Sequence, residues 1–195
     1  MHQLKFILAT QTRIPPKVKS IGYAILVLLM TNVSFLAAAE EPAPFCGIHS
    51  QDNIALEDIA PTLYSIVSGA PGEARNWDLF KSLFANNGTI TPVFHEQDKP
   101  VIEQMSVASF IALNESLFND IGFYESEVDS MIIEVGHMAT IISLYESREA
   151  PGQPVYSTGI NSFQLVNDGN RWCVISVTWD SDKGGHPIPS KLALD

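Results

Sequence analysis

The stretch 159–180, GINSFQLVNDGNRWCVISVTWD, decides the fold that the sequence predicts. On both sides of Asn167-Asp168-Gly169-Asn170, apolar residues alternate with polar ones, and β-branched and aromatic types dominate. An Asp-Gly turn between two alternating segments is the strongest short-range signal for a β-hairpin. We therefore expect two antiparallel strands, 155–166 and 172–179, joined by this turn.

The part of the chain that follows position 124 is predicted to be entirely β-sheet. The segments 125–135 and 138–148 alternate or run apolar, and short connections separate them from each other and from the hairpin. Long strands on short connections are typical of an antiparallel meander. These two segments are therefore expected to extend the hairpin to four strands.

Helical periodicity is confined to the chain before position 119. It occurs in 57–68, in a short segment capped by Asn76, and in 106–118. A short strand, 89–94, is expected between the second and third helices. The apolar stripe that we expect the third helix to turn toward the core is Phe110, Leu113 and Leu117. Helices first and strands afterwards predict an α+β fold, with the helices on one face of the sheet.

The first 39 residues have the pattern of a secretory signal. Four basic residues precede the nearly continuous apolar run 21–36, and Ala37-Ala38-Ala39 before Glu40 offers a cleavage site. The alternative is an uncleaved anchor, because 21–39 is close to the length that spans a bilayer. The alanine triplet favours cleavage, so we expect an exported protein, periplasmic or secreted.

The charge of the chain excludes partners that need a basic surface. There are 11 Lys and Arg against 22 Asp and Glu, a net charge of −11. Four of the basic residues and none of the acidic ones precede position 40, so the exported chain carries −15. Such a protein repels phosphate backbones and anionic lipids. We therefore expect neither nucleic acid nor, after cleavage, a membrane as a partner.

The two cysteines, Cys46 and Cys173, leave two interpretations open. In an oxidising compartment they can form a disulfide. Alternatively, Cys173 is a small buried apolar residue on the last strand. The sequence has no Cys-x-x-Cys and no Cys/His cluster with the spacing of metal ligands. We expect no metal and no other cofactor.

Several short motifs lie in the second predicted helix, at the start of the strand that follows it, and in the last strands: Trp77-Asp78-Leu79-Phe80 with Leu83-Phe84-Ala85, Gly88-Thr89-Ile90, Tyr145-Glu146-Ser147-Arg148, Gly159 to Leu165, Arg171-Trp172 and Trp179-Asp180. In these motifs and in the order of its predicted helices and strands, the chain resembles the nuclear-transport-factor-2-like superfamily, and within it the SnoaL-like bacterial members. The resemblance covers about 54–189. The predicted organisation is therefore a signal, 1–39, a flexible leader, 40–53, one domain, 54–189, and a tail, 190–195.

The resemblance implies a cone-shaped α+β fold. Three N-terminal helices would pack on a strongly curved antiparallel sheet and enclose an apolar pocket. The superfamily includes ketosteroid isomerase, scytalone dehydratase, polyketide cyclases, epoxide hydrolases and many members thought only to bind, so the motifs specify the fold far better than the activity.

Period-two geometry predicts which strand residues line this pocket. Asn161, Phe163 and Leu165 share one face of the first hairpin strand, and Cys173, Ile175, Val177 and Trp179 share one face of the second. The opposite face of the second strand carries Ser176 and Thr178. The predicted ligand-binding residues, together with Tyr64 on the first helix, are Asn161, Phe163, Ile175, Val177 and Trp179.

Three predicted residues carry the case for chemistry in this pocket. By resemblance, Tyr64 matches the oxyanion-stabilising tyrosine of ketosteroid isomerases, and Asn161 matches the second donor to the same oxygen. The catalytic carboxylate of that family is missing, because the corresponding stretch is Thr91-Pro92-Val93. His95, which follows the short strand, is the candidate general base near neutral pH.

Three functions follow as hypotheses. The first is a non-catalytic module that binds a small hydrophobic or aromatic ligand. The second is an isomerase, cyclase or dehydratase acting on a hydrophobic carbonyl compound, with His95 and Tyr64 as catalytic residues. The third is a structural module that forms a homodimer through the open face of its sheet.

Overall fold

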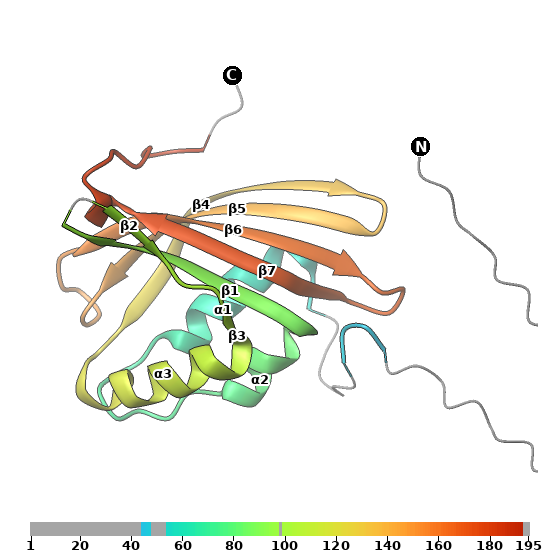
Figure 1. The fold of residues 1–195 in the computed structure, drawn as a ribbon, viewed down its shortest axis with the longest axis horizontal. Coiled ribbons are helices and arrows are strands. Elements are labelled where there is room, and N and C mark those ends of the chain that lie inside the picture. Colours follow the sequence, from blue (N-terminus) through green and yellow to red (C-terminus); the bar gives the residue numbers. More distant parts are fainter. Residues whose placement is uncertain (1–43, 48–53, 98, 193–195) are drawn as a thin grey trace, which may run out of the picture. The chain divides into compact units, whose positions relative to one another are not determined.

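The computed structural model describes residues 44–47, 54–97 and 99–192 (Figure 1). The predicted signal, 1–39, and most of the predicted leader, 40–53, lie outside these residues. Within the described part of the chain, no helix is long and apolar enough to cross a membrane.

The helices precede most of the sheet and are short. In order, they are the 3-10 turn η1 (Leu56–Asp58), α1 (Ile59–Val67), α2 (Trp77–Ser82), α3 (Val107–Asp120) and the 3-10 turn η2 (Asp182–Gly184). Asn76 and Ser106 begin α2 and α3 as predicted, because their side-chain oxygens accept hydrogen bonds from Leu79 N and Ser109 N, each at 3.1 Å. Pro61 lies in the first turn of α1, where no backbone donor is needed.

One curved sheet forms the other layer of the domain, and the helices lie on one side of it (Figure 1). Its strands are β1 (Phe84–Glu96), β2 (Lys99–Ile102), β3 (Met105–Ser106), β4 (Tyr124–Val135), β5 (Met138–Arg148), β6 (Ser157–Asn167) and β7 (Trp172–Ser181). The order is β2-β1-β7-β6-β5-β4, and β3 pairs with β1. The predicted α+β class, the hairpin β6–β7 and the antiparallel meander from β4 to β7 are confirmed.

The strand after α2 differs from its prediction. The expected strand was 89–94, but β1 begins at Phe84 and pairs in parallel with β7. Asn86-Asn87-Gly88 does not form a turn between helix and strand. It shifts the register instead, since Phe84 lies opposite Val174 while Thr89 lies opposite Ser176. The segment between β1 and α3, for which no strand is predicted, contains the two short strands β2 and β3.

The predicted core stripe of α3 is partly wrong. Leu113 and Leu117 are 55% and 47% exposed, whereas Ile111 and Phe118 are buried. Phe110 packs at the core, with its ring stacked on Phe80 at 5.4 Å between centroids. The helix is therefore rotated about its axis relative to the prediction, and two large leucines remain at the surface.

The core has a large and a small part. The large cluster fills the space between the helices and the inward face of the sheet, around residues such as Ile59, Ile141 and Leu165. The small cluster comprises Cys46, Ala85 and Cys173, with Val166 and Ile175 packed against it.

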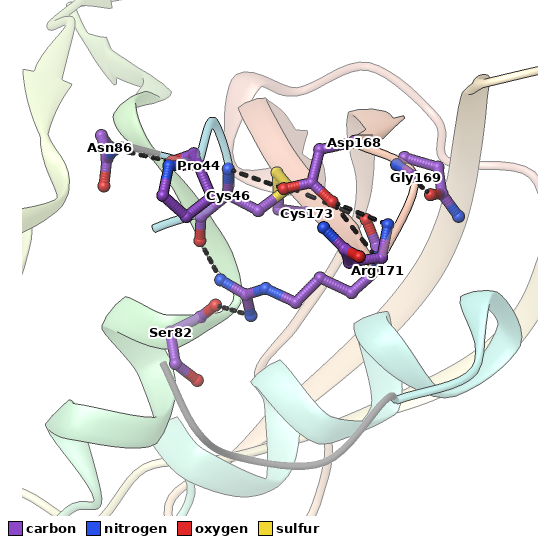
Figure 2. Close-up of a disulfide and its surroundings, with 10 residues drawn as sticks. Pro44, Cys46, Ser82, Asn86, Asp168, Gly169, Arg171 and Cys173 are labelled. Atoms are coloured by element: carbon purple, nitrogen blue, oxygen red, sulfur yellow. Dashed lines mark hydrogen bonds between the residues drawn. A yellow bond between two sulfur atoms is a disulfide. The ribbon is translucent and has the colours of Figure 1, made fainter. Parts of the chain in front are cut away.

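A disulfide joins Cys46 to Cys173 in this small cluster, with the two Cα atoms 5.6 Å apart (Figure 2). Arg171 donates hydrogen bonds to the carbonyl oxygens of Cys46 and of Ser82, the latter at 2.6 Å. The Asp168 carboxylate accepts from the backbone N–H groups of Cys46, Asn170 and Arg171. The hairpin turn thus fastens the short N-terminal segment 44–47 to the start of β7. Of the two interpretations of the cysteines, the structure has the disulfide.

Candidate functional site

A cavity of about 500 Å³ lies between α1, α3 and the inward face of the sheet. Most of its lining is apolar, including Leu63 and Val67 from α1, Phe110 from α3, and Ile90 and Phe123. Cavities of about 300 to 1,000 Å³ that are lined in this way are typical of sites for small molecules.

The cavity brings together residues from distant parts of the chain that the sequence had singled out. Those that line it are Tyr64, His95, Asn161, Phe163, Val177 and Trp179. Ile175 is the exception, since it does not line the cavity and packs instead beside the disulfide.

A β-bulge explains the position of Ile175. In the β6–β7 ladder, Gln164 pairs with Ser176 and Leu165 pairs with Val174, so Ile175 has no partner opposite it. The extra residue reverses the alternation. Val177 and Trp179 therefore face the cavity, whereas Cys173 lies on the other face, where it pairs with Cys46. The predicted inward face of β7 is correct only beyond the bulge.

Tyr64 stands at the centre of a buried hydrogen-bond network. Its hydroxyl lies 2.7 Å from Ser143 Oγ on β5, and Asn161 Nδ2 on β6 donates to it at 2.9 Å. Ser143 Oγ in turn donates to the Glu127 carboxylate on β4 at 2.6 Å. Tyr64, Ser143 and Asn161 are all buried. The network therefore connects α1 to three strands.

The direction of these bonds fixes what Tyr64 offers to a ligand. A hydroxyl carries one hydrogen, and the hydrogen of Ser143 goes to Glu127. Ser143 must then accept from Tyr64, so the Tyr64 hydrogen points away from the cavity. Burial raises the pKa of Tyr64, which outweighs its hydrogen bonds with Ser143 and Asn161, and the charge of Glu125 adds to the increase. Tyr64 is a neutral phenol whose free capacity is that of an acceptor.

Asn161 supplies the donor that Tyr64 lacks. One hydrogen of its amide is bound to Tyr64, which leaves the second hydrogen and the carbonyl oxygen. Among the described residues, no hydrogen bond uses that carbonyl oxygen. Because Asn161 lines the cavity, a ligand reaching it meets both a donor and an acceptor.

Glu125, near the start of β4, is a titratable cavity residue that the sequence analysis missed. Burial raises the pKa of its carboxyl to about 7, although a hydrogen bond from Ser147 Oγ at 3.2 Å opposes the increase. A second β-bulge, in β4, is the reason that strict alternation of inward and outward residues does not identify Glu125 as a cavity residue. Glu127 pairs with Tyr145 and Asp129 pairs with Leu144, which leaves Val128 unpaired. Counting alternate residues back from Ile132 therefore assigns Glu125 to the wrong face.

Tyr145 is a further residue that lines the cavity, and it is buried. Burial raises its pKa, and the negative charge of Glu125 raises it further. Its hydroxyl packs against Gly159 on β6, so closely that a Cβ atom at that position would collide with it. The glycine at the start of the hairpin motif therefore makes room for the phenol.

His95 lies at the end of the cavity formed by β1 and β7, and it is held by an acidic partner. Its Nε2 atom is 2.7 Å from Asp180 Oδ1. Partial burial raises the pKa of Asp180, but the hydrogen bonds from His95 and from the Ser181 N–H, with the charges of His95 and His186, outweigh it and lower the pKa. Asp180 is therefore a carboxylate.

Large apolar side chains surround the opening of the cavity. Five large hydrophobic residues line it while also being exposed: Phe94, Leu113, Leu117, Ile121 and Tyr156. Exposed apolar groups at the edge of an apolar cavity are typical of sites for hydrophobic ligands. This explains why two leucines of α3 leave the core.

No family model and no curated protein matches the sequence. Solved structures do match. A protein described as the beta subunit of an aromatic-ring-hydroxylating dioxygenase from Novosphingobium aromaticivorans aligns with a TM-score of 0.51 at 12% identity, over 65% of this chain and 86% of its own. A protein of unknown function with a cystatin-like fold from Nostoc punctiforme aligns with a TM-score of 0.50 at 12% identity, over 69% and 94%.

A nuclear-transport-factor-2-like protein of unknown function from Shewanella baltica also matches, with a TM-score of 0.44 at 14% identity, over 70% of this chain and 100% of its own. The likeness to these solved structures is consistent with the nuclear-transport-factor-2-like fold that the motifs predicted. At such identities the likeness extends to the fold alone.

Proposed function

We propose that this domain is exported and binds a small hydrophobic molecule that carries one hydroxyl or carbonyl group. The cavity carries the proposal: an apolar space of about 500 Å³ with the Tyr64–Asn161 pair on its wall. The disulfide supports export, because such bonds persist mainly in oxidising compartments.

The hydrogen-bond directions favour a particular ligand end. Asn161 offers one donor and one acceptor, and Tyr64 offers only an acceptor. A ligand hydroxyl can satisfy both residues, since it donates and accepts at once. A ligand carbonyl can use only the Asn161 amide. An aromatic or alicyclic body would pack against Phe163, Val177 and Trp179, which line the same cavity.

Replacing Asn161 by leucine is expected to weaken ligand binding at least tenfold. The substitution removes the donor and acceptor while keeping the size of the side chain, and leaving a buried ligand hydroxyl or carbonyl without its partner costs about 1 to 3 kcal/mol. A panel of hydroxylated and carbonyl-bearing steroids, polyketides and aromatics is first screened by native mass spectrometry and thermal shift to identify a ligand. Titration calorimetry then compares the variants.

The matched control is Gln164→Leu. Gln164 is an amide on the same strand, but it bonds Thr140 on the outward face, so its loss should leave the affinity unchanged. If every compound in the panel leaves the cavity empty, binding is not the function. If Asn161→Leu binds as tightly as the wild type, the polar contact lies elsewhere.

Catalysis is the second candidate, and Glu125 favours it. A carboxyl with a pKa of about 7 is suited to removing a proton beside a ligand carbonyl and returning it to another carbon, with Asn161 donating to the oxygen that gains charge. Glu125 is then a better base than the predicted His95, whose Nε2 is bound to Asp180. Tyr64 orients Asn161 in this scheme.

Under this second candidate, Glu125→Gln is expected to slow exchange of the protons beside the carbonyl by about 10²- to 10⁴-fold, the usual range for losing a general base. Deuterium exchange into a bound ketone, followed by NMR, measures the rate. His95→Ala is the comparison, because it removes the base that the sequence predicts. An unchanged rate in Glu125→Gln removes Glu125 from the mechanism, and no exchange in the wild type removes the catalytic function.

A further inference from the structure

Three metal-ligating side chains from separate segments meet at one end of the cavity. His95 comes from the end of β1, Asp180 from β7, and His186 from the segment after η2. One ligand atom from each lies within 4.8 Å of the other two. Asp180 is central, with Oδ1 2.7 Å from His95 Nε2 and Oδ2 3.3 Å from His186 Nε2.

The backbone brings these residues together by two devices. The parallel pairing of β1 with β7 places Pro92 opposite Trp179, three residues before His95 and one before Asp180. Gly185 then adopts a left-handed conformation, with φ of 76°, which turns the chain after η2 so that His186 reaches Asp180.

Gly184 keeps the space beside the two imidazoles open. A Cβ atom at this position would lie about 2.5 Å from ring atoms of both His95 and His186. The rings stand edge to face, with their centroids 5.5 Å apart. The positively charged side chain of Lys183 lies nearby but does not occupy the cluster, because its Nζ donates a hydrogen bond to the carbonyl oxygen of Tyr156.

We propose that His95, Asp180 and His186 bind one divalent transition-metal ion of the Zn²⁺ type. Imidazole and carboxylate ligands suit such ions, whereas Mg²⁺ and Ca²⁺ prefer sites built of oxygen alone. Zn²⁺ at about 2.0 to 2.2 Å from each ligand sets neighbouring ligand atoms about 3.3 Å apart. His186 already lies at that separation from Asp180, and the partly exposed side chains leave room for the remaining adjustment.

The position of the site gives the ion a place in the cavity. His95, Ser181 and Lys183 all line the cavity, so the metal lies at its edge. Three protein ligands leave at least one coordination position for water or for a ligand oxygen. The metal site does not depend on the proposed hydrophobic ligand. A metal ion there would offer a ligand in the cavity a second polar contact, in addition to the Tyr64–Asn161 pair.

Titration of the full chain, purified without a histidine tag and freed of metal by a chelator, tests the proposal. Zn²⁺ is followed by calorimetry, and Co²⁺ by its visible absorption, which reports nitrogen and oxygen ligands. We expect one ion per chain. His186→Ala and His95→Ala should each weaken binding at least tenfold, while His137→Ala, an exposed histidine in the β4–β5 turn, should leave it unchanged.

His186 is exposed, so its replacement should leave the fold intact, and circular dichroism checks this. Binding that is absent at 100-fold excess of Zn²⁺, or that has no defined stoichiometry, would overturn the metal site. So would one-to-one binding that survives both His186→Ala and Asp180→Asn, because the ion would then lie elsewhere.

Discussion

Replacing Cys46 by alanine is expected to lower the free energy of unfolding by about 2 to 5 kcal/mol, the usual cost of losing a native disulfide from a small exported domain. The bond closes a loop with a sequence separation of 127, so it strongly restricts the unfolded chain. Urea denaturation without reductant measures the difference. Alanine is preferred to serine, because it adds no polar group at this fully buried position.

Reductant supplies the control for this prediction. The wild type in reductant should unfold at about the urea concentration of Cys46→Ala, and reductant should not change the variant. If the wild type is equally stable with and without reductant, the cysteines do not stabilise the domain through their bond. If the variant also responds to reductant, some other process is being measured.

Glu125→Gln is expected to stabilise the protein at pH 8 by about 3 kcal/mol and to change little at pH 4. The folded pKa is raised from 4.5 to about 7, so the folded state holds the proton more tightly than the unfolded state. The stability that depends on a protonated Glu125 is fully present below pH 4.5, and it is lost as the pH rises from 4.5 to about 7. Each pKa unit corresponds to about 1.4 kcal/mol.

Urea denaturation of both proteins between pH 4 and pH 8 gives the two curves, whose difference isolates the contribution of Glu125. The matched control is Glu134→Gln, an exposed acid on the same strand, which should follow the wild type. A Glu125→Gln protein that is less stable than the wild type at pH 8 would mean that the carboxylate stabilises the fold, and the base proposed for catalysis would lose its basis.

The sequence predicted the part of the fold that depends on local patterns. The Asp-Gly turn and the alternation on either side of it specify β6 and β7, and short connections place β4 and β5 beside them. Polar caps located the beginnings of α2 and α3. In each case the deciding interaction joins residues that are close along the chain.

Features that depend on distant contacts were missed. The pairing of β1 with β7 joins residues nearly ninety positions apart, and nothing in the local pattern of 84–96 indicates it. The bulges at Val128 and Ile175 each reverse the alternation of a strand. That reversal misplaced Ile175 and concealed Glu125.

The candidate site was predictable to the same extent. Tyr64 and Asn161 share one hydrogen-bond network, but Ser143 and Glu127, which set the direction of its hydrogens, come from two other strands. The cluster of His95, Asp180 and His186 has no characteristic spacing, because three separate segments supply it. Export, the homodimer and the ligand roles stay predictions.

The bond between Cys46 and Cys173 also determines how the domain carries a mechanical load. Tension applied from the N-terminal side passes through Cys46 directly into β7, which lies between β1 and β6 in the sheet. The chain between the two cysteines, about 430 Å when fully extended, stays out of the path of the force. The helices α1 to α3 and the strands β1 to β6 would therefore bear none of this tension in a protein pulled from its N-terminus, and only β7 among the cavity strands would carry it.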